Sequence, residues 1–272
     1  MRLAERVERA ILEGDPSSPL GRARLKAAIE ARRLLVRLGD PTVRYRIEGV
    51  ELELPLSHQL PFYRDAHPEY DVPLARIACE LGGPVVDVGA NVGDTAAAIR
   101  ARCGVPVLCV EGDERFFALL ERNATRLGDV ELERSFVDVP ARGRVERAHG
   151  TARVVAGDDA LPAKPLEQVL EQHPQFAAPA LLKLDTDGFD VPILLANLDL
   201  LVRLRPVLFF EYDPHLGARP EVFTRLQEVG YHTAEWYEHT GKLAATVPLP
   251  EHFHDQYVGH GGARYADVCV RP

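Results

Sequence analysis

The chain has 272 residues, of which 46% are hydrophobic and 27% are charged, a composition typical of a globular protein rather than a disordered or collagen-like one. Acidic residues outnumber basic ones by 41 to 32, and the net charge of −9 argues against a surface that binds a phosphate backbone. No apolar run approaches the roughly 20 residues of a transmembrane helix, and the first residues lack the apolar core of a signal peptide. We therefore predict a cytoplasmic protein with no nucleic acid partner and no membrane insertion.

Residues 1–75 are predicted to form an extension made of helices, a hairpin and a substrate-side loop. Apolar residues recur at helical spacing up to Leu38, and Gly39-Asp40-Pro41 ends that pattern. Segments 43–47 and 50–54 alternate apolar and polar residues on either side of Glu48-Gly49, which predicts a β-hairpin. Residues 55–73 are rich in Pro, His and Tyr and are expected to form a loop.

Residues 76–272 predict one α/β domain with a doubly wound, mostly parallel sheet. Short runs rich in Val, Leu and Phe are typical of strands covered on both faces, and they lie at 84–88, 105–110, 180–184 and 206–210. Helices are expected at 94–102, 114–127, 165–172, 191–203 and 219–229. A third strand is expected within 130–138, a hairpin near 240–241 and a last strand near 265–270.

Two further expectations concern single side chains. Asn123 is expected to face solvent on its helix. The cysteines form no Cys-x-x-Cys pair and are interpreted as small hydrophobic core residues; they are Cys79, Cys103, Cys109 and Cys269.

The predicted strands end in acidic loops. Ligands of such sheets bind beyond the carboxyl ends of the strands, so these loops are expected to converge on one site. They are Asp87–Asp94, Glu111-Gly112-Asp113, Asp185–Asp190 and Glu211–His215.

The loop after Gly89 argues against a dinucleotide cofactor. A Gly-x-Gly-x-x-Gly turn would place glycines where this chain has Asn91 and Asp94, and a carboxylate there would repel a pyrophosphate. No tyrosine is followed four residues later by the lysine that a short-chain reductase needs. S-adenosylmethionine has no phosphate and presents an ammonium and a sulfonium group, so acidic loops favour it as the cofactor.

Each part of that cofactor has an expected contact. Asp87 is assigned to the ammonium group, Glu111 to the ribose hydroxyls, and the end of the third strand to adenine. The complete predicted set is Asp87, Gly89, Ala90, Asn91, Gly93, Asp94, Thr95, Glu111, Gly112, Asp113, Phe136, Val137 and Asp185.

Two strings resemble the FkbM-type methyltransferases: VVDVGANVGDT at 85–95 and LKLDTDGFD at 182–190. The resemblance covers about residues 60–272. It implies a seven-stranded class I methyltransferase fold and methyl transfer to oxygen, commonly a sugar hydroxyl in a glycan or secondary metabolite. Relatives often have Glu-Gly-Ala-Glu where this chain has Asp187-Gly188-Phe189-Asp190, which is interpreted as a subfamily variant.

Methyl transfer requires an acceptor oxygen held about 3 Å from the methyl group, and a base helps because a sugar hydroxyl is a weak nucleophile. Asp185 is the first candidate for the base or for the group that orients the acceptor. The alternative catalytic candidates are Asp187, Glu211 and His215. Residues expected to bind the acceptor, which is a small molecule or a glycan, are Tyr63, His67, Tyr70, Asp213 and His254.

Several alternatives stay open. Carboxylates at the strand ends are also ligands that a hard divalent ion accepts, but no metal is predicted. The acceptor could lack a sugar, or the chain could be a binding protein that has lost catalysis, although intact Asp87, Glu111 and Asp185 argue against that loss. The oligomeric state is open, with a homodimer as one alternative.

Overall fold

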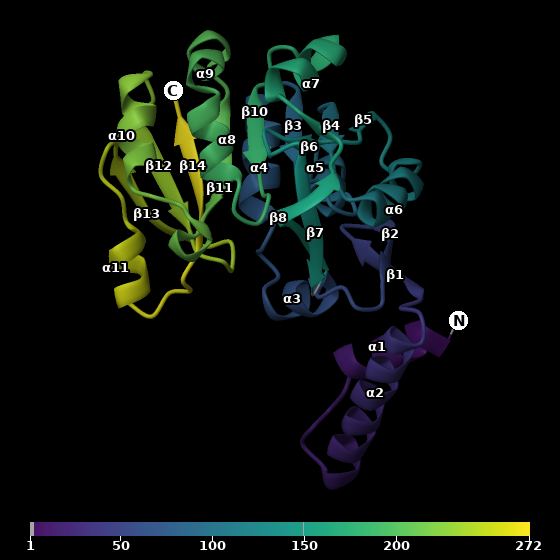
Figure 1. The fold of residues 1–272 in the computed structure, drawn as a ribbon. Helices are drawn as coiled ribbons and strands as arrows, with labels where there is room; N and C mark the ends of the chain where they lie inside the picture. Colours follow the sequence, from purple (N-terminus) through teal and green to yellow (C-terminus); the bar gives the residue numbers. More distant parts are fainter. Residues whose placement is uncertain (1–2, 149) are drawn as a thin grey trace.

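The computed structural model describes residues 3–148 and 150–272, and its centre is an eight-stranded sheet of order β13-β12-β14-β11-β10-β3-β4-β5 (Figure 1). The five strands from β11 to β5 are parallel, whereas β14 is antiparallel to both of its neighbours. The predicted doubly wound, mostly parallel sheet is confirmed, with β13 as an eighth strand. The bounds are β3 Val85–Val88, β4 Val107–Val110, β5 Val130–Glu133, β10 Leu181–Leu184, β11 Val207–Tyr212, β12 Thr233–Tyr237, β13 Leu243–Pro248 and β14 Ala266–Arg271.

Helices cover both faces of this sheet. Successive strand side chains point to opposite faces, so the apolar strands have side chains to bury on each face. One apolar cluster includes Val85 of β3 and joins α4 (Val72–Leu81), α5 (Asp94–Arg100) and α6 (Glu114–Ala124). The other includes Val86 and joins α7 (Leu166–Gln172), α8 (Asp190–Ala196), α9 (Leu198–Leu204) and α10 (Glu221–Glu228). A single helix was expected over 191–203, but it is divided at Asn197, whose amide bonds to Ile193 O and Asp138.

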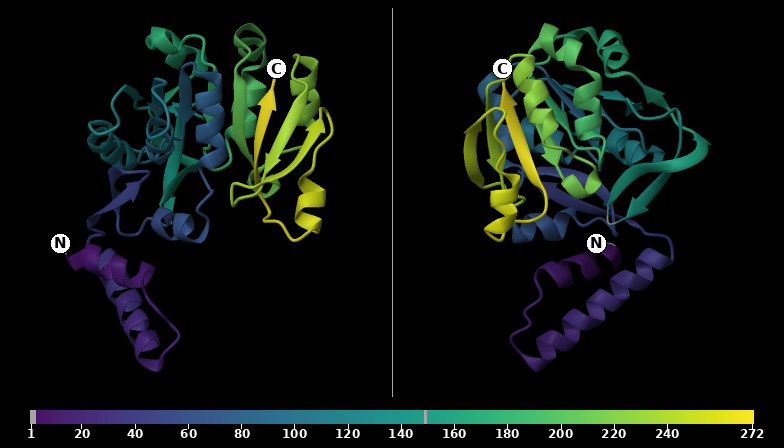
Figure 2. Two further views of the ribbon diagram at one scale, coloured as in Figure 1. Left: turned by 180° about the vertical axis from the view of Figure 1, so that it is seen from behind. Right: turned by 60° about the vertical axis from the view of Figure 1, so that its left-hand side comes forward.

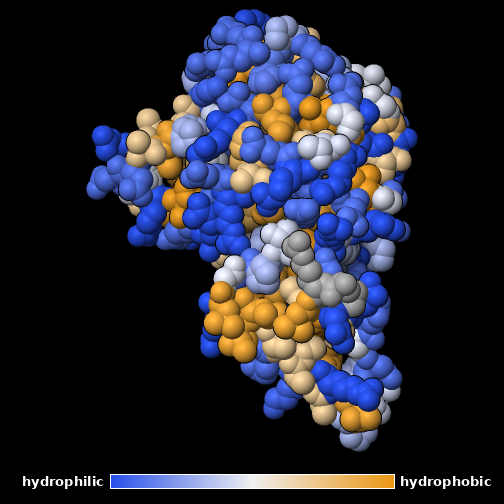
Figure 3. Space-filling model, turned by 90° about the vertical axis from the view of Figure 1, so that its right-hand side faces the viewer, coloured by the Kyte–Doolittle hydropathy of each residue, from blue (hydrophilic) through white to orange (hydrophobic). Residues whose placement is uncertain are grey.

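The N-terminal segment begins with a helical pair that projects from the body, α1 (Leu3–Leu12) and α2 (Pro19–Arg37), as both views of Figure 2 show. Hydrophobic side chains gather on these helices (Figure 3), and the exposed leucines of this part are Leu3, Leu20, Leu34 and Leu38. The predicted hairpin is confirmed as β1 (Thr42–Ile47) and β2 (Val50–Pro55). No helix within the described ranges is both long and apolar enough to cross a membrane.

Several elements were not predicted. The expected loop at 55–73 contains α3 (Leu60–Ala66) and the start of α4. The chain after β5 forms β6 (Phe136–Val137), which pairs with β9 (Ala163–Lys164) outside the main sheet. Between them, β7 (Arg142–Ala148) and β8 (Thr151–Ala160) form a long antiparallel hairpin. The remaining elements are η1 (Pro174–Phe176), η2 (Pro214–Leu216) and α11 (His254–Gly259).

The expectation that all cysteines are core hydrophobes is wrong for two of them. Cys79 of α4 and Cys103 after α5 form a disulfide, whereas Cys109 and Cys269 are free and buried. The two helices pack side by side, which brings together cysteines 24 residues apart in the sequence. The bond therefore fastens two helices that both begin beside the site described below.

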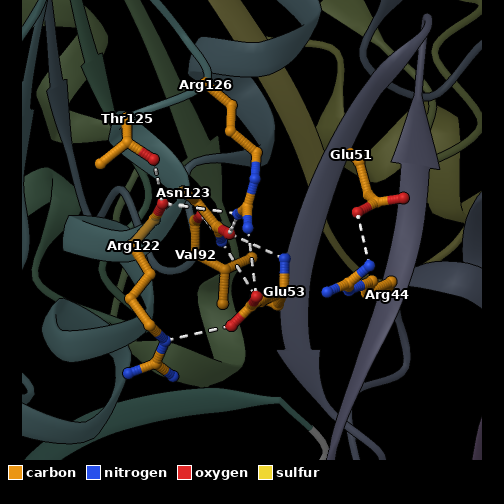
Figure 4. A network of polar contacts seen from close by, with 8 residues as sticks. All are labelled: Arg44, Glu51, Glu53, Val92, Arg122, Asn123, Thr125 and Arg126. Carbon is orange, nitrogen blue, oxygen red and sulfur yellow. Dashed lines mark hydrogen bonds and ion pairs between the residues drawn. The ribbon is translucent and has the colours of Figure 1, made fainter. Parts of the chain in front are cut away.

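The expectation for Asn123 is also wrong, because its side chain is fully buried. It lies within a network of polar contacts (Figure 4). Its Oδ1 accepts a hydrogen bond from Glu53 N at 2.7 Å, and its Nδ2 donates to Glu53 O at 2.9 Å and to Val92 O at 2.8 Å. One amide thus joins α6 to β2 and to the loop after β3. The helical spacing of the sequence could not indicate partners 70 and 31 residues away.

Replacing Asn123 with Ala should lower the free energy of unfolding by about 3 kcal/mol, because its three bonds to backbone groups are lost and these buried groups are left without partners. Arg122→Ala is the matched control, since this neighbour forms a half-exposed ion pair with Glu53 and should cost less than about 1 kcal/mol. Urea unfolding measures both. Equal losses in the two variants would contradict the structural role of Asn123.

The disulfide should be visible in solution as two free thiols in the denatured, unreduced protein and four after reduction, counted with a thiol reagent. Replacing Cys79 and Cys103 together with Ser should lower the free energy of unfolding by about 3 kcal/mol, because the denatured chain loses its cross-link. Reductant should then destabilise the native chain but not the double variant. Four free thiols before reduction would refute the bond.

Candidate active site

A row of charged side chains lies on one face of the sheet at its carboxyl edge. Lys183 of β10 is in register with Asp87 of β3, and Glu211 of β11 is in register with Asp267 of β14. Alternation along the strands puts these residues on the face that packs against α4 and α5, and Asp185 follows Lys183 by two positions. Because β14 is antiparallel, its beginning lies at the edge where the parallel strands end.

The Lys183 ammonium is buried at the centre of this row. Its Nζ lies 2.9 Å from Asp87 Oδ1 and 3.4 Å from Asp185 Oδ2, and it donates to Gly89 O at 3.2 Å. Burial opposes the charged form, but Asp87 and Asp185 outweigh it and hold the pKa of Lys183 well above its ordinary value. The lysine therefore stays charged and ties β10 to the loop after β3.

The loop after β3 follows a path that depends on its glycine. Gly89 has φ +81°, and a Cβ at this position would lie 1.8 Å from the Asp185 carbonyl oxygen. Asn91 also has a positive φ of 49°, a region that Asn adopts more readily than most residues. The loop consequently runs close against the start of the Asp185 loop, with its backbone N–H groups turned towards the end of β4.

Glu111, the first residue after β4, is held by that loop. Its Oε2 accepts from Asn91 N at 2.8 Å and its Oε1 from Asp113 N at 2.7 Å. Burial raises the pKa of Glu111 to about 7, although the two N–H donors favour the charged form. A fixed carboxylate at this strand end can accept hydrogen bonds from a diol.

A small cavity of about 50 Å³ opens beside Glu111. Its walls are mainly apolar and include Phe136, Val137 and Phe189, and it also reaches Gly112. A Cβ on Gly112 would lie 2.3 Å from the Phe136 ring, so only glycine allows the aromatic side chain this position. Apolar walls beside a fixed carboxylate suit a flat ring joined to a diol.

A larger cavity of about 350 Å³ adjoins the small one, and the two share Gly89, Asn91, Asp185 and Asp187. Carboxylates and tyrosines dominate its lining. Predicted residues that line it are Tyr63, Tyr70, Gly89, Asn91, Asp94, Thr95, Asp185, Asp187, Glu211 and Asp213. The two cavities are parts of one cleft along the carboxyl edge of the sheet.

Repulsion and burial raise several carboxyl pKa values in this cleft. Burial, together with nearby Asp185, raises the pKa of Glu211 to about 10 and that of Asp267 to about 8. Burial likewise raises the pKa of Asp187 to about 7. All three groups therefore hold a proton more firmly than an ordinary carboxyl group does.

Some predicted residues lie outside the cleft lining. Asp113 caps α6 through Arg115 N and Phe116 N, and its other oxygen pairs with Arg147 at 2.6 Å. His254 is buried, with Nε2 2.6 Å from Arg264 O. Also absent from the lining of both cavities are Asp87, Ala90, Gly93, His67 and His215. Asp87 acts on the cleft through Lys183.

Other residues of the cleft were not predicted. Lys183 lies in the string at 182–190, but neither Lys183 nor Asp267 follows the end of a strand. Tyr265 donates its hydroxyl to Tyr63 at 2.9 Å, because Tyr63 already donates its own to His239 O. The signal that could have found Asp267 is an acidic residue at the start of an antiparallel strand.

His58 also lacked a sequence signal. Its Nδ1 accepts from Leu60 N at 3.1 Å, and burial lowers its pKa, so the neutral ring carries its proton on Nε2, 3.3 Å from Asn91 Oδ1. Asn91 Nδ2 in turn donates to Gly150 O at 2.8 Å, at the tip of the β7–β8 hairpin. This chain of bonds joins the N-terminal segment, the loop after β3 and the hairpin above the cleft.

No group of three or more His, Cys, Asp or Glu side chains in the described part of the chain is arranged to hold a metal ion.

Solved structures similar to this chain include methyltransferases. The METTL16 methyltransferase domain has a TM-score of 0.51 and 10% identity, with 91% of this chain and 79% of that chain covered. Methyltransferase FkbM from Methylobacillus flagellatus KT has a TM-score of 0.44 and 12% identity, with 70% of this chain covered. The match spans 43% of the length of the Methylobacillus protein, and no curated protein matches.

The similarity to the METTL16 methyltransferase domain shows the class I methyltransferase fold that was expected. The model of the methyltransferase FkbM domain matches residues 87–233, more than half of the 272 residues, and includes the loop after β3 and the Lys183–Asp190 segment. The chain belongs to the FkbM methyltransferase family.

Proposed function

We propose that the chain is an S-adenosylmethionine-dependent O-methyltransferase that acts on a hydroxyl group of a sugar, a glycan or a glycosylated small molecule. The observation that carries the proposal is the two-part cleft, in which an apolar cavity beside Glu111 joins a carboxylate-rich cavity at Asp185. A cofactor with a flat base, a diol and a positively charged end matches these two halves.

The residues present fit this cofactor. Glu111 is fixed at the mouth of the apolar cavity, where it would hold the ribose hydroxyls, and Phe136 would lie against adenine. The buried carboxylate of Asp87 has one partner among the described residues, the Lys183 ammonium 2.9 Å from Oδ1, and its Oδ2 has no hydrogen-bond donor. An ammonium group held near Asp87, directly or through water, would supply the missing donors.

The acceptor side is proposed from the second cavity. Tyr63 and Tyr70 contact each other edge to face, with ring centroids 4.7 Å apart, and both line this cavity with Asp213. Aromatic rings stack on sugar faces, and carboxylates bind sugar hydroxyls. We also propose that residues 1–75 form a substrate-side extension and that residues 76–272 form the cofactor-binding domain.

When bound, the cofactor supplies a methyl group on a sulfonium. The acceptor oxygen attacks that methyl carbon in line with the departing sulfur. The protein holds the acceptor oxygen close to that methyl group. Asp185 orients the acceptor hydroxyl and is the first candidate for the base, since its carboxylate lines both cavities. Asp187 and Glu211 are better alternatives for the base than His215, because both line the cleft and His215 does not.

Calorimetry should detect binding of S-adenosylmethionine and S-adenosylhomocysteine at sub-millimolar concentrations. Replacing Glu111 with Gln should weaken both at least tenfold, because a charged acceptor facing the ribose is lost and hydrogen bonds to charged groups contribute about 1.5–3 kcal/mol. Glu114→Gln, on an exposed side chain three positions along, is the control and should bind normally. Absence of binding by the native chain would remove the enzymatic proposal.

Asp185→Asn should retain S-adenosylhomocysteine affinity while turnover falls by about 10²–10⁴, because the amide neither takes a proton nor orients the hydroxyl in the same way. Turnover is measured by mass spectrometry of deuteromethyl transfer to a panel of sugars and glycans. Asp199→Asn, at an exposed position of α9, should leave turnover unchanged. An Asp185→Asn variant with native turnover would refute the role of Asp185.

A further inference from the structure

Glu211 and Asp267 form a pair of carboxyl groups in the cleft. The proposed reaction gives no role to the pair as a whole. They are direct cross-strand neighbours in β11 and β14, and opposite Cβ atoms in such a pair lie about 5 Å apart. Both side chains line the larger cavity. Within the described ranges, neither carboxyl group has a hydrogen bond or an ion pair, and the Lys183 charge favours the ionised form of Asp267 only from a distance.

The surroundings make two charges on this pair costly. The carboxylates that face it or share its cavity are Asp71, Asp94, Asp185, Asp187, Asp190 and Asp213. Cations on the other elements are already engaged: Lys183 with Asp87 and Asp185, Arg64 with Asp71, and Arg264 with Asp213 at 3.6 Å. The hydroxyls of Tyr63 and Tyr265 bond to each other.

Close carboxyl groups in such a setting titrate as a unit and retain a proton that isolated groups would lose. The raised pKa values of Glu211 and Asp267 agree with this geometry. A positive charge in the same cavity acts in the opposite direction, because it stabilises the ionised form. The proton content of the pair should therefore depend on the charge of the molecule in the cavity.

We infer that Glu211 and Asp267 share a proton that is released when the cationic methyl donor binds and that the pair takes up the proton of the acceptor hydroxyl during transfer. This inference rests on the proposed function. It moves the role of base from Asp185, which is paired with Lys183, to a pair that has no ion-pair partner, and it leaves Asp185 to orient the acceptor hydroxyl.

The acceptor oxygen forms a bond to the methyl carbon, and the carbon–sulfur bond breaks with its electrons left on sulfur. The hydroxyl proton passes to the ionised carboxylate of the pair. Because sulfur is then neutral, the charge that had favoured ionisation is gone, and the pair holds the proton more firmly.

The test compares S-adenosylmethionine with S-adenosylhomocysteine, which differ by one methyl group and one positive charge. Calorimetric titrations at pH 7.5 in buffers of different ionisation enthalpy give the protons exchanged on binding. The cationic ligand should release between about half and one proton more than the neutral one. Changes common to both ligands, such as those at Glu111, cancel in this difference.

Variants identify the group responsible. Glu211→Gln and Asp267→Asn should each reduce the extra release, because one carboxyl group is lost and the group that remains has one repulsive neighbour fewer and holds its proton less firmly. Asp187→Asn, in the same cleft, should keep it. Each substitution at the pair removes a buried repulsive charge, and circular dichroism should show a native fold.

Equal proton counts for the two ligands would overturn the inference while leaving cofactor binding intact. An extra release that persists undiminished in Glu211→Gln and Asp267→Asn but disappears in Asp187→Asn would also overturn it. If neither ligand binds, the proposed function itself fails. Infrared titration of the free protein then still decides whether the pair retains a protonated carboxyl group above pH 7.

Discussion

The buried ammonium group of Lys183 is the contact on which the geometry of the site depends. Removing such a charge from water costs several kcal/mol, and the cost is offset only if opposite charges and acceptors lie in the right places. Here Asp87, Asp185 and the carbonyl of Gly89 provide them. Because these groups belong to β3, to its loop and to the end of β10, the two strands must keep one register.

That register determines what else meets at the edge of the sheet. With Lys183 beside Asp87, the loop after β3 turns under the Asp185 carbonyl, and its N–H groups reach Glu111 on the next strand. On the other side, β11 brings Glu211 into the same row. The apolar cavity and the charged cavity adjoin because a single charge pair fixes the strands between them.

The parallel half of this arrangement was predictable from the sequence. Short apolar runs located β3, β4, β10 and β11, and acidic residues after them indicated a site at the carboxyl edge. The same rule passed over Lys183, which lies inside a strand, and Asp267, which begins an antiparallel one. The rule considers only residues that follow strands, whereas the sheet collects side chains by position in space.

The remaining differences concern partners that are distant along the chain. Asn123 is buried because it meets Glu53 and Val92, and Cys79 meets Cys103 only because two helices pack together. The His58 ring packs against Gly150 at the tip of the β7–β8 hairpin, far away in the sequence. The local spacing of residues does not indicate such distant contacts. Short elements such as α3 have too few turns to show a helical period of apolar residues.

The position of β14 in the sheet links the chemistry of the site to the integrity of the sheet. This strand lies between β11 and β12 and pairs with both, so a chain that stopped before residue 266 would expose the edges of two strands. Exposed edges are templates for aggregation. Loss of Asp267 by truncation would therefore not yield a soluble, inactive protein: the segment that completes the carboxyl pair is also the segment that keeps neighbouring molecules from joining edge to edge.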